Sequence, residues 1–360
     1  MFSNTSSQSS VPFQYKLFSL LSKRNKGENV LFSPLSIFVI LSLAANGASG
    51  KTKDEILKGL SYQTIEELNE INGKIREKYC KFTTVEIANA VMTKIKPLKT
   101  FEVKAGEYKA CCEKLESLEQ VNKWCSDRTH GKISKILDHL TTETIMILLN
   151  AVYFKGSWFN EFKASETTTV DFFSTKYGRQ SVKMMKVKEK FCYYEDNNLQ
   201  AVELPYKEDN AAAIIILPKS GINSLVSNFS NVFQTVYKGL RREYVELKLP
   251  KFRQESNYDL REYLEALGIK SAFDSKSADF REITQEVSLY VSKVVHKALL
   301  NVDEEGTEAA AVTAVLTLGL GWNQEKYIEM NVDKPFIFVI ISQNLMNEHN
   351  ILFVSKVENI

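Results

Sequence analysis

The chain has 360 residues, of which 44% are hydrophobic and 25% are charged, a composition typical of globular proteins. With 46 basic and 44 acidic residues the formal net charge is +2, so charge gives no argument for binding nucleic acid or an anionic membrane. The five cysteines lack zinc-ligand spacing and predict reduced, mostly buried thiols.

The beginning of the chain is polar. Residues 1–10, MFSNTSSQSS, lack the basic and apolar regions of a signal peptide, which predicts a cytoplasmic protein or one secreted by a leaderless route. The apolar stretch 30–45 is too short to cross a bilayer. It is expected to form a buried helix with Pro34 in its first turn.

Periodicity predicts helices mainly in the first part of the chain and strands mainly in the second. Helices are expected at 13–23, 36–48, 52–60, 66–81 and 258–267. Strands are expected at 85–93, 182–185, 193–206, 211–218, 244–252, 287–303 and 333–342. Thr52 and Glu55 have the spacing of a capping box at the start of helix 52–60. Since no repeat or linker divides the chain, a single domain over 1–360 is predicted.

The segment Val302–Trp322, between two of these strands, has a composition unlike either. After the acidic pair Glu304-Glu305 and Gly306, it continues mainly with small residues. Alanine and glycine are poor strand formers, and a long connection without firm structure is usually functional. A flexible surface loop is one interpretation. Small side chains at every second position also suit a loop that converts into a strand between strands already packed.

Several segments resemble the serpins, a family of serine protease inhibitors. Residues 304–311, Glu304-Glu305-Gly306-Thr307-Glu308-Ala309-Ala310-Ala311, resemble the hinge of the serpin reactive-centre loop. Residues 29–37 (NVLFSPLSI) and 47–56 (GASGKTKDEI) resemble the second serpin helix and the turn after it. Residues 118–137 resemble the helix that crosses the main sheet, and 145–162 resemble its third strand. The resemblance runs from near residue 12 to the C-terminus.

The resemblance implies an α+β fold, with helices packed around a large central mixed β-sheet, smaller sheets, and an exposed reactive-centre loop at 304–326. It implies a suicide-substrate inhibitor rather than an enzyme. Counting from Gly306 as in most inhibitors of the family, the cleaved bond is expected between Leu320 and Gly321. Counting backward from Pro335 favours Gln324 instead.

Leu320 suits the apolar pocket of a chymotrypsin-like or elastase-like serine protease, which is the expected partner. Neither Arg nor Lys lies between Thr307 and Glu325, which argues against trypsin-like targets. An inhibitor that also acts on cysteine proteases, and a non-inhibitory serpin acting as chaperone or ligand carrier, stay open. A monomer is expected, with loop-to-sheet oligomers as the alternative state.

The sequence contains no G-x-S-x-G elbow, H-E-x-x-H or phosphate-binding loop, so no catalytic residue, cofactor or metal is expected, and no nucleic acid or membrane partner. By the resemblance, His296 is expected to lie with Asn150, Ser33 and Ser36 in a polar cluster under the centre of the main sheet. The resemblance implies that this cluster gates the opening of the sheet. Trp158 is expected to be buried, by the resemblance beneath the point where the loop enters.

Two features fall outside these sites. The lysines at positions 94, 96, 99 and 104 predict a solvated basic face rather than a polyanion site. The C-terminus departs from the family pattern, with Ser355 where a glycine is common and Asn359-Ile360 in place of the usual terminal proline. The packing of the last strand is therefore expected to differ from that of other members.

Overall fold

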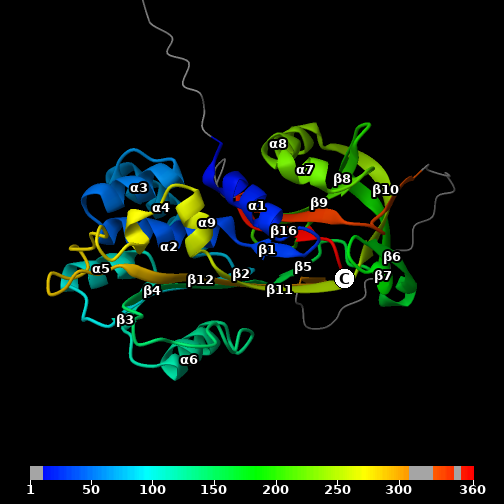
Figure 1. Ribbon diagram of the computed structural model, residues 1–360. Helices are drawn as coiled ribbons and strands as arrows, with labels where there is room; N and C mark the ends of the chain where they lie inside the picture. Colours follow the sequence, from blue (N-terminus) through cyan, green and yellow to red (C-terminus); the bar gives the residue numbers. More distant parts are fainter. Residues whose placement is uncertain (1–10, 308–326, 344–349) are drawn as a thin grey trace, which may run out of the picture.

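Two β-sheets and two groups of helices make up the protein (Figure 1), a computed structural model that describes residues 11–307, 327–343 and 350–360. The α-helices are α1 (Phe13–Arg24), α2 (Pro34–Gly47), α3 (Gly50–Leu60), α4 (Ile65–Tyr79), α5 (Lys99–Glu107), α6 (Leu118–Arg128), α7 (Asn223–Ser227), α8 (Phe229–Gly239) and α9 (Arg261–Ala266). Among these helices, none combines the length and apolarity that crossing a bilayer requires.

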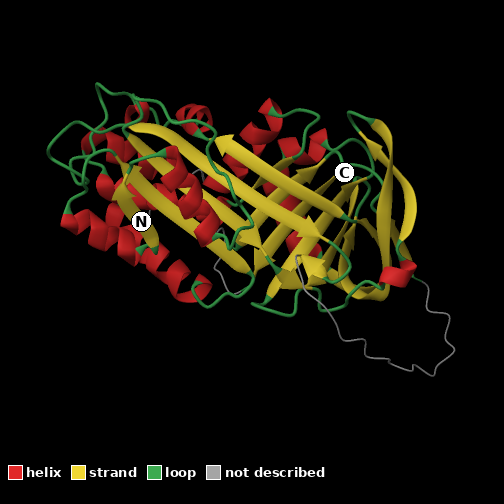
Figure 2. Ribbon diagram, turned by 90° about the horizontal axis from the view of Figure 1, so that it is seen from below, coloured by secondary structure: helices red, strands yellow, loops and turns green. Residues whose placement is uncertain are grey.

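The main sheet has the strand order β3–β2–β4–β12–β13–β5, and β11 pairs with the other edge of β12. Its strands are β2 (Val85–Thr93), β3 (Ala110–Lys114), β4 (Met146–Phe154), β5 (Gly156–Ser157), β11 (Phe252–Asp259), β12 (Val291–Val302) and β13 (Gly306–Thr307). Figure 2 shows its long strands side by side across the molecule. At its centre β4 and β12 are parallel and directly paired, from Met146 opposite Val291 to Tyr153 opposite Leu299.

The second sheet has the order β1–β16–β15–β9–β8–β7–β10–β14, with β6 paired to β7. Its strands are β1 (Val30–Phe32), β6 (Thr168–Ser174), β7 (Gly178–Glu195), β8 (Leu199–Pro205), β9 (Ala211–Pro218), β10 (Arg241–Pro250), β14 (Ile328–Asn331), β15 (Phe336–Ser342) and β16 (Ile351–Val357). Strands β9, β15 and β16 are buried along their whole length, which explains their nearly continuous apolar sequences.

The main sheet is covered on both faces. One face packs, together with α2 and the second sheet, into the large core of the protein. The other face packs against α6 and the loop after it, in a smaller core that includes Trp124, Ile136 and Leu149. Figure 1 shows α6 on the opposite side of the main sheet from α2. A strand added between β4 and β12 would therefore be buried on both faces.

The predicted capping box at Thr52 is wrong. Helix α3 begins two residues earlier, at Gly50 with Ser49 as N-cap, so that Thr52 is buried inside the helix. The Thr52 hydroxyl accepts a hydrogen bond from Asp279 N–H (3.0 Å). The Glu55 carboxylate accepts from the N–H groups of Lys270 (2.8 Å) and Ser271 (2.7 Å). Both side chains bind a loop far along the chain instead of capping their own helix.

The segment 118–137 forms only partly a helix, since α6 ends at Arg128. His130 and Gly131 have φ angles of 50° and 76°, in the left-handed region that a continuing helix does not use. The rest of the segment is a loop over the main sheet. Asn122 holds this loop, because its side-chain oxygen accepts hydrogen bonds from Ile136 N–H (2.8 Å) and Leu137 N–H (3.0 Å).

Two other predicted elements are also corrected. The strand expected at 193–206 is the end of β7 and the whole of β8, joined by a turn in which the Asp196 carboxylate accepts from Asn198 N–H (2.7 Å) and Leu199 N–H (3.0 Å). The helix expected at 258–267 is the shorter α9, because its first two residues belong to β11.

Of the cysteines, only Cys125 is buried, so the expectation of mostly buried thiols is wrong; all five are free.

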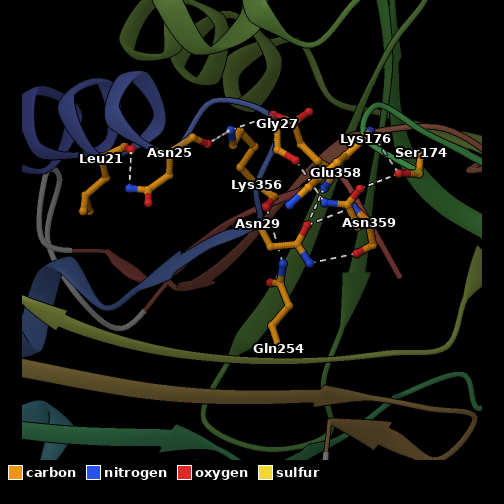
Figure 3. A network of polar contacts seen from close by, with 10 residues as sticks. All are labelled: Leu21, Asn25, Gly27, Asn29, Ser174, Lys176, Gln254, Lys356, Glu358 and Asn359. Carbon is orange, nitrogen blue, oxygen red and sulfur yellow. Dashed lines mark hydrogen bonds and ion pairs between the residues drawn. The ribbon is translucent and has the colours of Figure 1, made fainter. Parts of the chain in front are cut away.

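The C-terminus is held by polar contacts (Figure 3). The Asn29 side chain accepts from the N–H groups of Glu358 (2.7 Å) and Asn359 (2.9 Å) and donates to Asn359 O (2.8 Å). Lys356 and Glu358 form a 2.6 Å ion pair with both side chains buried. The Ser355 hydroxyl donates to Gln254 Oε1. The residues that depart from the family pattern thus bond to the surrounding strands and loops.

Candidate functional site

The chain reverses direction after β12 in a tight turn at Asp303–Gly306. Asp303 N–H donates to Gly306 O (2.9 Å), and Asp303 Oδ1 accepts from the N–H groups of Glu305 (3.1 Å) and Gly306 (3.3 Å). The turn directs the next residues back along β12 as β13, with Thr307 opposite Val302. The first residues of the expected loop 304–326 are therefore part of the fold, not exposed coil.

Strand β13 fills a narrow slot between β12 and β5. Gly306 lies opposite Ser157, and Thr307 opposite Gly156. A Cβ atom on Gly306 would lie 2.1 Å from Gly156 O, so this close approach of two backbones excludes any side chain. Thr307 is fully buried, and its Oγ1 is 2.8 Å from the Tyr206 hydroxyl. Burial raises the pKa of Tyr206 far above its ordinary value, so that it stays a neutral partner.

Trp158 packs against the turn at Asp303–Gly306 and is fully buried, as expected. Its indole Nε1–H donates to Asp303 O (2.9 Å), and its backbone N–H donates to Glu305 O (2.9 Å). The indole stacks on the Tyr206 ring, with 4.4 Å between centroids and 16° between planes. Trp158 and Tyr206 therefore connect the turn to β13.

Glu304 fastens the outside of the turn. Its carboxylate forms a 2.5 Å ion pair with Lys251 and accepts from Thr167 Oγ1 (2.8 Å), while its carbonyl accepts from Phe162 N–H (2.9 Å). Burial acts to raise the pKa of Glu304, but the hydrogen bonds from Lys251 and Thr167 outweigh it, and the pKa lies below its ordinary value. Glu304 is thus held as a carboxylate.

The predicted polar cluster is assembled beneath the centre of the main sheet. His296 and Asn150 lie opposite each other on β12 and β4, with His296 Nδ1 2.5 Å from Asn150 Oδ1. Ser36 Oγ donates to the same oxygen (2.7 Å), and Ser33 N–H donates to His296 Nε2 (3.1 Å). Asn150 Nδ2 donates to Asn89 on β2 (2.5 Å), which extends the cluster to a third strand.

The hydrogen bonds also define the state of the imidazole. Since Nε2 accepts from Ser33 N–H, the proton of the neutral ring is on Nδ1, which donates to Asn150. Burial lowers the pKa of His296 from 6.5 to about 3. A second proton on Nε2 would face the Ser33 N–H group and break that hydrogen bond. The neutral ring therefore joins the two central strands, β12 and β4, through its hydrogen bond to Asn150.

Sequence reasoning missed five residues of this site: Asn89, Thr167, Tyr206, Lys251 and Asp303. The spacing from Asp303 to Gly306 was a usable signal, because Asp is common at the start of tight turns. The others carry no local pattern. The hinge residues Glu308, Ala309, Ala310 and Ala311, the expected bond at Leu320 and Gly321, and its rival at Gln324 lie outside the described residues. Within the described part, no group of three or more His, Cys, Asp or Glu side chains is placed to hold a metal ion.

Comparison with known proteins matches this geometry to one family. The family model "Serpin (serine protease inhibitor)" matches residues 8–360. The chain is 31% identical to leukocyte elastase inhibitor of Xenopus laevis, over 91% of this chain and 93% of that protein. Among solved structures, Serpin48 of the insect Tenebrio molitor superposes with a TM-score of 0.87 at 29% identity, over 97% of this chain and 96% of that one.

Human thyroxine-binding globulin complexed with its ligand is equally similar, with a TM-score of 0.87 at 28% identity and 96% of both chains covered. The expected α+β fold is confirmed by these superpositions. The match to the family model spans nearly the whole sequence, including both sheets, the turn at Asp303 and the cluster around His296. The chain belongs to the serpin family.

Proposed function

We propose that the protein is a suicide-substrate inhibitor of serine proteases, whose cleaved loop inserts between β4 and β12. The observation that carries this proposal is β13: the chain after Val302 has already turned back and entered the sheet between β12 and β5. Because β5 continues the line of β4, the residues after Thr307 need only extend β13 in the same direction.

The register of β13 can be continued along both neighbours. Ala309 would lie between Phe154 and Leu300, and Ala311 between Val152 and Ala298, all of them buried in the large core. Glu308, on the other face, would lie between Lys155, which is exposed, and Asn301, which is partly exposed.

The chain thus has alanines where the inserted strand would face the core and an acidic residue where it would meet a lysine. This agreement between sequence and register supports insertion in this frame.

Insertion has to separate the strands that His296 and Asn150 join. In the continued register Thr313 would arrive between these two residues, with its side chain on the same face as that of Thr307. Its hydroxyl can both donate and accept a hydrogen bond. When insertion breaks the hydrogen bond between His296 and Asn150, the hydroxyl of Thr313 would then offer both side chains a new partner. This lowers the barrier to opening the sheet.

The inhibitory step follows from this movement. A protease attacks the loop and forms an acyl-enzyme on the residue before the cleaved bond. Insertion of the loop up to that residue, at about 3.3 Å per residue, moves the attached protease by roughly 45 Å. Loss of the oxyanion-hole geometry in the displaced protease stops deacylation. The free energy for the movement is stored in the uncleaved fold, which is therefore kinetically stable.

The proposed target is a chymotrypsin-like or elastase-like protease that cleaves between Leu320 and Gly321, because an apolar residue fills the primary pocket of such enzymes. The name of one relative, leukocyte elastase inhibitor, supports this class. Cysteine proteases are a further class of target, since they also form an acyl-enzyme. The bond after Gln324 is the rival cleavage site.

The experiment is to mix the protein with a panel of serine and cysteine proteases and to separate the products in SDS. An inhibitor gives a covalent complex at the summed mass and releases a C-terminal peptide. Mass spectrometry identifies this peptide: a start at Gly321 supports the bond after Leu320, and a start at Glu325 supports the rival. Complete cleavage without any complex would overturn the proposal.

A non-inhibitory serpin is the second candidate, supported by the similarity to thyroxine-binding globulin. Thermal unfolding after a single cut in the loop separates the two. Insertion adds backbone hydrogen bonds to the sheet and buries apolar side chains, so an inhibitor melts at a markedly higher temperature once cut. A carrier that does not insert its loop keeps the melting temperature of the intact protein.

A further inference from the structure

The turn that joins β8 to β9, residues 206–210, lies beside the slot that β13 occupies. It is closed by a hydrogen bond from Tyr206 N–H to Ala211 O (2.9 Å). Asp209 and Asn210 have φ angles of 60° and 49°, in the left-handed region where Asn and Asp are the commonest residues after glycine. Two such residues in succession are typical of a tight hairpin turn, which fixes the direction of the Asp209 side chain.

One carboxylate oxygen of Asp209 binds the start of the main sheet. Asp209 Oδ2 accepts hydrogen bonds from Thr83 N–H (2.7 Å), Thr84 N–H (2.7 Å) and the Thr84 hydroxyl (2.6 Å). Thr84 is buried just before β2, and its carbonyl accepts from the N–H group of Lys155 (2.6 Å), the residue between β4 and β5. Asp209 therefore holds the point at which β2, β4 and β5 meet.

The same turn also holds β5 directly. Glu208 Oε2 accepts from Ser157 N–H (3.1 Å), and Lys207 N–H donates to Ser157 O (2.9 Å). The turn is itself fixed to the end of β15, because the Asp209 carbonyl accepts from the Ser342 hydroxyl (3.3 Å). The β5 side of the slot is thus joined to the second sheet.

The opposite side of the slot, β12, is joined to the second sheet by other contacts. Strand β12 pairs with β11, and the Ser256 hydroxyl on β11 donates to Leu31 O on β1 (2.6 Å). The fit between the two sides is close, since a Cβ atom on Gly306 would lie 2.1 Å from Gly156 O. The separation of β5 and β12 is therefore already set for one strand in the uncleaved protein.

We propose that Asp209 is a positioning residue for loop insertion: it holds β5 beside β13, so that the cleaved loop extends β13 along an edge that is already in place. This inference rests on the proposed insertion mechanism. An inserting strand that lacks one neighbour leaves backbone groups without hydrogen bonds, which raises the barrier at the start of insertion. Loss of the Asp209 carboxylate should therefore slow insertion, while hydrolysis of the acyl-enzyme continues at its own rate.

The test uses two matched variants. Asp209→Gly removes the carboxylate and keeps the backbone, since glycine adopts a φ of 60° without strain. Glu55→Ala is the control, because Glu55 Oε2 also accepts from two successive N–H groups, those of Lys270 and Ser271, and from the Ser271 hydroxyl (2.9 Å). Figure 1 shows α3, which carries Glu55, at the end of the molecule away from β5. Both variants lose the same pattern of hydrogen bonds, but only one loses it beside the slot.

Hydrogen exchange in the uncleaved protein, followed by mass spectrometry, tests the β5 side of the slot without a protease. Peptides that contain Gly156–Ser157 and Gly306–Thr307 should exchange faster in Asp209→Gly than in the wild type, and at the wild-type rate in Glu55→Ala. Unchanged exchange in Asp209→Gly would overturn the role of Asp209 in holding β5. Equal acceleration in both variants would show a general loosening of the fold, and would overturn that role as well.

The second measurement is the ratio of cleaved protein to covalent complex, with the panel protease that the wild type traps fastest. This ratio compares hydrolysis with insertion, so a variant that is only less stable leaves it unchanged. Asp209→Gly should raise the ratio about fivefold, the effect of one net hydrogen bond on a rate, and Glu55→Ala should not change it. An unchanged ratio in Asp209→Gly would overturn the role of Asp209 in insertion.

If Asp209→Gly does not fold, Thr84→Ala decides. It removes one of the three hydrogen bonds at its donor, and should shift exchange and ratio in the same directions. A wild-type protein that traps no protease of the panel would overturn the proposed inhibition, and with it the role of Asp209 in insertion. The exchange measurement would then still decide whether Asp209 holds β5.

Discussion

His296 and Asn150 join the two central strands of the main sheet through one buried hydrogen bond, Nδ1–H to Oδ1, of 2.5 Å. The strands are otherwise held by their backbone ladder. A strand that enters between them has to break both the side-chain hydrogen bond and the backbone hydrogen bonds of this ladder. The same imidazole accepts from Ser33 N–H at Nε2, and that hydrogen bond is lost when Nε2 takes up a proton.

Acid should therefore weaken the uncleaved protein through His296. Its folded pKa of about 3 lies below the ordinary 6.5, so between these values the unfolded state binds a proton that the native state does not. The stability that neutral His296 contributes is fully present above pH 6.5 and is lost as the pH falls towards 3. The free energy of unfolding should change by up to about 1.4 kcal/mol per pH unit in this window.

Urea unfolding at a series of pH values measures this slope, with His296→Gln as the control that cannot titrate. The variant should be less stable at pH 7 and should lose less stability on acidification. Carboxylates contribute to both proteins and cancel in the difference. Parallel pH curves for the two proteins would rule out His296 as the sensitive group.

Ala311→Arg tests the proposed register of insertion. In that register position 311 faces Val152 and Ala298 in the core, where an arginine is strongly unfavourable. The variant should be cleaved by the target as a substrate and form little covalent complex. Glu308→Arg is the matched control on the other face, where the side chain would lie beside Lys155 and Asn301, and should retain most complex formation. The two yields are compared by densitometry in SDS gels.

Equal loss in both variants would mean that the frame of insertion is wrong. Thr307→Arg cannot serve for this test. Thr307 is already buried in the uncleaved protein, so an arginine there would disturb the hinge before any cleavage.

Gly306→Ala should displace β13 from its slot. The added methyl group would meet Gly156 O at 2.1 Å, and a backbone oxygen cannot move aside without shifting β5. We expect a loss of roughly 2 kcal/mol or more in the free energy of unfolding, typical of overpacking in a buried site. Gly221→Ala, where an added Cβ meets no atom within 4 Å, should change stability little. A Gly306→Ala protein as stable as wild type would contradict the narrow slot.

Reversing the charge of Glu304 should loosen the turn. Glu304→Lys opposes two ammonium groups, removes the acceptor for Thr167, and should lower the urea midpoint and promote oligomers through the opened sheet. The double variant Glu304→Lys with Lys251→Glu restores the attraction and should recover much of the midpoint. Native gels and urea titration of the three proteins measure both effects. No recovery in the double variant would show that packing, and not charge, holds the turn.

The sequence was most informative where structure is decided locally. The predicted bounds of β2 and β9 agree with the structure, because each is a continuous run of strand-forming or apolar residues. Strand β11 was missed beyond its first residue. Its inward-facing positions include Gln254 and Ser256, which bond to Ser355 and to Leu31 O, so the apolar alternation that identifies a strand is absent.

The candidate site shows the same limit. The family resemblance named His296, Asn150, Ser33, Ser36 and Trp158. The contacts that hold the turn at Asp303–Gly306 and β13 join residues far apart in the chain, with sequence separations of 53 for Lys251 and Glu304 and 101 for Tyr206 and Thr307. A lysine and a tyrosine carry no local signal for such partners, which only the folded chain brings together.

The first strand of this fold to be synthesised pairs with the last one. Strand β1 pairs with β16, and Asn29 just before it bonds to Asn359, 330 residues later. Ser33, just after β1, donates its backbone N–H to His296, which is synthesised much later. A chain emerging from the ribosome therefore carries Val30–Phe32 as an unpaired apolar edge for most of its synthesis. The hydrogen bond between Ser33 and His296 at the centre of the main sheet can form only near the end of translation. Chaperones therefore have their longest opportunity to bind at this first strand.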